Sequence, residues 1–171
     1  PAPHTRLWVR WLELLLRAAQ DPNPRVRLQA VLTIGSLPRD ARPLDRMLAL
    51  GQGGDPLLTH AVLSGLDGVE SEALETLLEE NEERDARGDR AQFLEAVTTA
   101  AFTAIRAKPS PATATANLLD RIHDLTQPAT RASLISGIAA AQRLPGAGRV
   151  ALAAPHPLLQ QESDETRPIR S

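Results

Sequence analysis

The sequence predicts an all-α fold in which about eight antiparallel helices stack as a right-handed solenoid. The first observation is an internal repeat, since Asn23-Pro24-Arg25-Val26 and Asp55-Pro56-Leu57-Leu58 lie 32 residues apart. The second is the helical spacing of the apolar residues after these turns. The third is composition: aromatic residues make up 2% of the chain and tyrosine is absent, so the interior must come from Leu, Ala, Val and Ile, and no stretch alternates like a strand. Corresponding apolar positions in the two copies are Ala30 and Val62, Ile34 and Leu66, and Leu37 and Val69.

Four helices are predicted in the first part of the chain, each bounded by Pro, Gly or a capping residue. The first covers residues 5–20 and carries an apolar stripe. Asn23 caps the second, residues 24–37, and Pro43 opens the third, which the glycines after Leu50 end. The fourth begins at Pro56 and exits at Gly68, and Gly65 within it is a point where two helices could approach closely. The stripe of the first helix consists of Trp8, Trp11, Leu12, Leu15 and Ala19.

Four more helices are predicted in the second part of the chain. Ser71 is expected to cap the fifth, and the stretch 79–90 is expected to be an exposed helix end and loop because it has almost no apolar side chain. Asp89 is expected to cap the sixth. The remaining predicted helices cover residues 90–107, 111–125 and 128–143, and the sixth has a stripe of Phe93, Val97, Ala100/Ala101 and Ala104/Ile105.

Domain organisation follows from where the helical pattern stops. Residues 1–144 are expected to form one helical repeat domain, and the Pro-rich stretch 145–171 a C-terminal linker or tail. Two alternatives remain for that tail: a free linker, or a segment in which residues 149–159 lie against the last helix. Because the chain starts at Pro1 and has no signal peptide, we also expect it to be a piece of a longer protein.

Charge is nearly balanced over the chain but uneven along it. The net charge is −2, with +4 in residues 1–54, −8 in residues 55–90 and +2 in residues 91–171. Such an asymmetry could steer a partner, although solvated helix faces are its commoner cause. The absence of cysteine excludes disulfides, thiolate nucleophiles, Cys-ligated zinc and covalent haem attachment in this stretch. No apolar run reaches the ~20 residues that a bilayer span needs.

Several residue groups suggest chemistry, and each has a simpler structural interpretation. The four histidines, His4, His60, His123 and His156, are dispersed and form no metal-binding motif. Gly51-Gln52-Gly53-Gly54 lacks the Gly-Lys-Ser/Thr ending of a phosphate loop and follows a helix, so a turn is expected. The carboxylates between Glu79 and Asp85 lack the apolar pocket that catalytic carboxylates need. No Gly-x-Ser-x-Gly context for a nucleophile occurs.

Two further groups could bind a partner. Arg25 and Arg27 flank Val26, so they straddle the expected buried stripe and either pair with Asp21 or Asp55 or recognise an acidic partner or a phosphate. Trp8 and Trp11 either complete the core at its N-terminal end, contact a preceding domain, or form an exposed anchor.

The turn of the first copy carries a family resemblance. The segment from Asp21 to Ala30 resembles a bacterial HEAT-type repeat of the short kind, whose turn reads Asp-x-Asp/Asn-Pro followed by x-Val-Arg. The second copy departs from it, with Leu57 and Thr59 in place of the two arginines. The stretch from His60 to Ser64 also resembles the HEAT segment of large, haem-binding, membrane-bound-dehydrogenase-like proteins, in which a HEAT array lies between a propeller-like domain and a cytochrome c domain. That resemblance implies a scaffold segment of a periplasmic electron-transfer protein, while the haem motif Cys-x-x-Cys-His is absent here.

The function expected from the sequence is a non-catalytic helical-repeat scaffold that mediates protein–protein or interdomain interaction within a larger multidomain protein. Its candidate partner-binding residues are Arg25, Arg27 and His60, with no catalytic, metal or cofactor residue assigned. Nucleic-acid binding is the first alternative; the Arg-rich first third permits it and the acidic middle opposes it. A HEAT-like lyase or glycosylase is the second, although the sequence names no pocket for it. The compartment stays open, and is periplasmic if the resemblance to haem-binding proteins holds.

Overall fold

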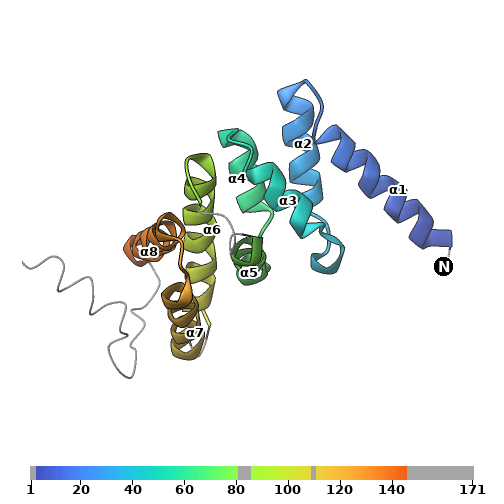
Figure 1. The fold of residues 1–171 in the computed structure, drawn as a ribbon. Helices are drawn as coiled ribbons and strands as arrows, with labels where there is room; N and C mark the ends of the chain where they lie inside the picture. The colour runs from blue at the N-terminus through green and yellow to red at the C-terminus, as the bar shows by residue number, and fades with distance from the viewer. Residues whose placement is uncertain (1–2, 81–85, 109–110, 146–171) are drawn as a thin grey trace, which may run out of the picture.

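The structure, a computed structural model, describes residues 3–80, 86–108 and 111–145, and in these ranges it is all-helical with no strand (Figure 1). This confirms the predicted fold class at the level of secondary structure. A short 3₁₀ helix, Arg39–Ala41, precedes α3. The α-helices are α1 (Pro3–Ala18), α2 (Pro24–Gly35), α3 (Leu44–Gly51), α4 (Pro56–Ser64), α5 (Glu70–Glu80), α6 (Asp89–Arg106), α7 (Pro111–Asp124) and α8 (Pro128–Arg143).

The two copies of the sequence repeat begin their helices in the same way. Asn23 has an extended backbone, and its side-chain oxygen accepts a hydrogen bond from the amide of Arg25 at 3.0 Å. Asp55 does the same for the amides of Leu57 at 3.0 Å and Leu58 at 3.4 Å. In both copies a proline occupies the first helical position, where its missing N–H costs nothing. The repeated turn is therefore a repeated helix start.

The helices pack in a regular order. Each of α1, α3 and α5 packs against the helix that follows it, and the even-numbered helices contact one another in succession, α2 with α4, α4 with α6 and α6 with α8 (Figure 1). The contact between α4 and α6 is much smaller than those between α2 and α4 or between α6 and α8. Closest packing therefore occurs in the first half and in the second half of the chain, with a thinner connection between them.

The repeat positions fill the core, except that Val26 is exposed and Leu37 is only partly buried. Ile34, Val62 and Leu66 are fully buried, Ala30 is nearly so, and Leu58 is 7% exposed. Val26, expected to be buried like Leu58, is 38% exposed. The reason is its position in the array: α4 has α2, α3 and α6 around it, whereas α2 packs mainly against α1 and α4.

Gly65 allows the close approach that the sequence suggested. A Cβ atom built on Gly35 would lie 2.7 Å from the Cα of Gly65, and one built on Gly65 equally close to the Cα of Gly35, so a side chain at either position would collide with backbone. Gly65 is however the C-cap of α4, which ends at Ser64, and the predicted extension of that helix to Gly68 is wrong. Gly68 follows in the left-handed region, with φ of 77°.

Other local predictions are corrected by the structure. Ser71 lies inside α5, which begins one residue earlier, and Asp89 is the first residue of α6, whose N-cap is Gly88. Ala86 is fully buried, and its amide donates to Oγ1 of Thr130 at 2.9 Å, so the stretch 79–90 is not wholly exposed. Trp11 is 61% exposed and does not join the core.

Some predictions fall outside the described residues. These are the tail 146–171, the carboxylates of Glu82, Glu83 and Asp85, and the side chain of Trp8.

Candidate docking groove beside helix α6

Helix α6 has two different long faces. One is buried in the core and carries Phe93, Leu94, Val97, Phe102 and Ile105 among others. The opposite face carries small side chains at the spacings i, i+3, i+4 and i+7, which place them along one side of the helix. These are Ala96, Thr99, Ala100, Thr103, Ala104 and Ala107.

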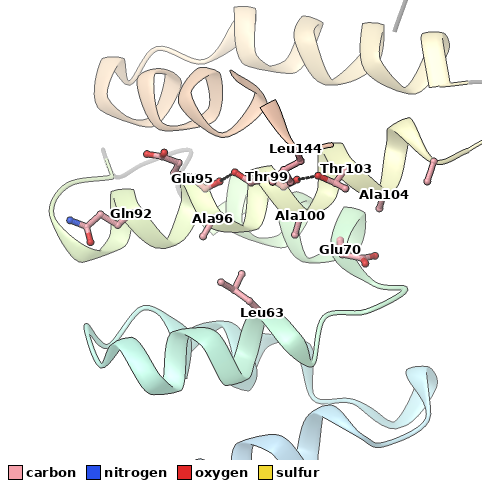
Figure 2. A pocket seen from close by; sticks show the side chains of 11 residues that line it. Leu63, Glu70, Gln92, Glu95, Ala96, Thr99, Ala100, Thr103, Ala104 and Leu144 are labelled. Atoms are coloured by element: carbon pink, nitrogen blue, oxygen red, sulfur yellow. Dashed lines mark hydrogen bonds between the residues drawn. The ribbon is translucent and has the colours of Figure 1, made fainter. Parts of the chain in front are cut away.

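This second face is the floor of a groove of about 750 Å³, called the α6 groove below. Figure 2 shows Leu63 of α4 pointing toward this face from one side, Glu70 at the start of α5, and Leu144, just after α8, near Thr99 and Thr103. The groove opens where α4 and α6 make little contact. Its lining consists of Leu63, Glu70, Gln92, Glu95, Ala96, Thr99, Ala100, Thr103, Ala104, Ala107 and Leu144.

The threonine hydroxyls on the floor are already hydrogen-bonded within the protein. Oγ1 of Thr103 donates to the carbonyl of Thr99 at 2.7 Å, and Oγ1 of Thr99 shares its hydrogen between the carbonyls of Glu95 at 2.9 Å and Gly137 at 3.1 Å. Their methyl groups and the neighbouring alanines remain to meet a ligand. Because a hydroxyl satisfied by a backbone carbonyl makes no demand on a partner, the floor is suited to apolar contact.

The polar groups of the groove lie at its edges. Glu70 and Glu95 contribute carboxylates, Gln92 contributes an amide, and no Arg, Lys or His is part of the lining. A ligand that is apolar along its length with a positive charge near one end therefore matches the groove better than an acidic one.

Sequence reasoning missed the division of α6 into these faces. It treated Ala100/Ala101 and Ala104/Ile105 as one stripe, whereas Ala101 and Ile105 are buried and Ala100 and Ala104 line the groove. Alanine gives no signal for one face or the other, because it is common in cores and on exposed helices. The available clue to the groove face was the helical spacing of the small residues Ala96, Thr99, Ala100 and Thr103.

Arg27 pairs with Asp55, which is one of the two roles that the sequence suggested for it. Its Nη2 lies 3.1 Å from Oδ2 of Asp55, and its Nη1 donates to the carbonyls of Asp21 and Pro22, both at 3.1 Å. The hydrogen bond from Arg27 to the carboxylate of Asp55 lowers the pKa of Asp55 below its usual value. The backbone amides of Leu58 and Leu57 act in the same direction, and desolvation opposes them. Arg27 thus ties the start of α2 to the start of α4.

The other two predicted binding residues are exposed. Arg25 lies in the first turn of α2, outside the groove lining. His60 precedes Leu63 by three residues and so lies on the same side of α4, but it is not part of the groove lining. The structure does not gather Arg25, Arg27 and His60 at one place in this groove, and their role in binding stays a prediction.

Arginines of the basic first third also have internal roles that the sequence did not reveal. Arg42 donates through Nε to the carbonyl of Leu37 at 2.8 Å and through Nη1 to those of Gly65 at 2.9 Å and Asp67 at 2.8 Å. Arg39 pairs with Glu72. These side chains satisfy helix-end carbonyls or neighbouring charges. Part of the arginine content of this region therefore serves contacts within the protein.

Within the described ranges, no cluster of three or more His, Asp or Glu side chains is placed to hold a metal ion. None of the helices described combines the length and the apolar character needed to cross a bilayer. Comparison of the chain with protein-family models, with curated proteins and with solved structures gives no match.

Proposed function

We propose that this chain is a non-catalytic helical-repeat scaffold that binds an apolar segment of a protein partner, or of a neighbouring domain, in the α6 groove. The observation that carries the proposal is the groove itself: a floor of alanines and threonine methyl groups, satisfied hydroxyls, and carboxylates confined to the edges. A row of small side chains lets a helix or an extended chain approach closely, as recognition of peptides in grooves requires.

The proposal includes a HEAT-like, right-handed solenoid in which α2, α4, α6 and α8 form one row and α1, α3, α5 and α7 the other. Support comes from the successive contacts of the even-numbered helices and from the shared helix start at Asn23 and Asp55. In such arrays each hairpin leaves an apolar face that its neighbour covers, and the row of inner helices offers a continuous binding surface. The α6 groove lies on the row formed by α4, α6 and the end of α8.

The test is selection of peptides from a random display library on the immobilised full chain, followed by binding measurements of the selected peptides. We expect apolar peptides whose affinity falls at least about tenfold on Ala100→Arg, because a long charged side chain would fill the floor. Ala132→Arg is the matched control, since Ala132 is an exposed α8 residue outside the groove lining. Peptides that bind both variants and the unmodified chain equally, or no selected peptide at all, would contradict the proposal.

A further inference from the structure

The chain itself contains a segment that fits the α6 groove. Leu144 lines the groove and is 46% exposed, one residue before the end of the described range 111–145. The chain therefore leaves the folded domain at the groove. Whatever follows residue 145 begins within reach of the floor.

The sequence that follows has the character that the groove selects. Residues 149–159 read Arg-Val-Ala-Leu-Ala-Ala-Pro-His-Pro-Leu-Leu, which is apolar apart from Arg149 and His156. No acidic residue occurs between residue 145 and Glu162. The groove lining has the opposite balance, with Glu70 and Glu95 and no basic residue. Charge and hydrophobicity are thus complementary between the groove and the segment tethered beside it.

Length also agrees. From Gln92 to Ala107 the α6 face is about 22 Å long at the rise of an α-helix, and an extended chain covers that distance in about seven residues. The segment 149–159 is longer than this, and the four residues 145–148, Pro-Gly-Ala-Gly, leave room to turn. A tether this short gives the segment an effective concentration near the millimolar range, so weak apolar contact is enough to occupy the groove.

We infer that residues 149–159 of the same chain dock in the α6 groove. The inference rests on the proposed function insofar as it concerns the same groove. Its test does not depend on any partner, however, and a tail that fails to dock leaves the peptide selection above unaffected.

Cross-linking is a direct test because the chain has no cysteine of its own. Leu152→Cys is combined with Ala96→Cys or with Ala104→Cys, which lie toward opposite ends of the groove floor, and disulfide formation under mild oxidation is followed on non-reducing gels. The control combines Leu152→Cys with Ser136→Cys, an exposed position on α8 outside the groove and about 12 Å along the helix from Leu144. At least one groove pair is expected to close about tenfold faster than the control pair, within the monomer and independently of protein concentration.

Two results would overturn the inference. One is a closing rate for both groove pairs no higher than that of the Ser136 control. The other is cross-linking that yields only dimers and slows on dilution, which would make a second copy the occupant. A further variant separates apolar docking from chance proximity: Leu158→Asp with Leu159→Asp should remove the advantage of the groove pair, whereas Gln160→Asp with Gln161→Asp, which adds the same charge just outside the segment, should retain it. Equal effects of these two variants would also count against docking of 149–159.

Discussion

The contact between α2 and α4 and the contact between α6 and α8 join successive even-numbered helices by different means. In the first, a backbone contact at Gly35 and Gly65 is accompanied by arginines that bind helix ends, Arg27 at the start of α4 and Arg42 at its end. In the second, the more extensive one, α8 lies along α6, and Gly137 fits over the backbone of Glu95 and the side chain of Thr98.

The difference explains where the groove lies. Glycine and arginine contacts at the helix ends help to fix the order of α2 and α4, and the more extensive lengthwise contact of α6 and α8 makes those two helices one unit. The link between α4 and α6 has neither feature, and its reduced contact leaves one face of α6 open. The candidate binding surface is thus found where the two kinds of packing meet.

The largest expected effect comes from breaking the lengthwise contact. A Cβ atom at Gly137 would lie 2.6 Å from the carbonyl oxygen of Glu95 and 2.7 Å from Cβ of Thr98, and neither can move without shifting α6. Gly137→Val should therefore lower the free energy of unfolding by about 3 kcal/mol, measured by urea denaturation followed by circular dichroism. Replacing a mid-helix glycine also brings a gain in helix propensity of less than about 1 kcal/mol. The expected loss from the steric clash is larger than this gain.

Gly53→Val is the control for this prediction. The nearest atom to a Cβ at Gly53 is the carbonyl oxygen of Leu50 at 3.4 Å, and the residue is exposed. We expect a change within about 1 kcal/mol. Equal losses for the two variants would mean that the close contact of α6 and α8 is not what makes Gly137 important.

The same comparison shows how far the sequence could predict this protein. The helix starts at Asn23 and Asp55 were predictable because a capping side chain followed by proline is a local signal, and the helices of the second half were predictable from Pro and apolar spacing. The Gly65 contact was also foreseen. In contrast, nothing local distinguishes Ala100 from Ala101, and the groove depends on which helices fail to meet. That is a property of the tertiary arrangement.

Buried charge gives a second, smaller difference between the two contacts. Arg106 of α6 is 9% exposed and donates to the carbonyl of Ala141 in α8. Arg42 donates to the carbonyls of Leu37, Gly65 and Asp67 but is only half-buried. Water can replace a lost donor at Arg42 more easily than at Arg106, so Arg106→Met should cost about 2 kcal/mol and Arg42→Met about 1 kcal/mol of unfolding free energy.

Arg143→Met serves as the reference for both variants, because Arg143 is an exposed residue at the end of α8. Urea midpoints of the three variants, interpreted with the slope of each transition, give the ranking. If Arg42→Met costs more than Arg106→Met, helix-end contacts contribute more than the lengthwise contact, and the comparison above is reversed.

The smallest expected effect concerns the ion pair of Arg27 and Asp55 and is best measured as a pH dependence. The pKa of Asp55 is lowered in the folded state, chiefly by the hydrogen bond from Arg27, so between the folded and unfolded pKa values the unfolded chain binds the proton more readily. The stabilisation is therefore complete above the unfolded pKa of about 4 and is lost as the pH falls through the folded pKa.

Asp55→Asn keeps a capping side chain like that of Asn23 and removes only the charge. The variant should have a slightly lower melting temperature than the unmodified chain at pH 7, and the two should converge as the pH falls through the lowered pKa of Asp55 in the folded state. Asp67→Asn, at an exposed position, controls for the loss of one carboxylate. A gap between Asp55→Asn and the unmodified chain that stays constant with pH would show that Asp55 stabilises the start of α4 as a cap alone, and that the link from α2 to α4 rests on the glycine contact and Arg42.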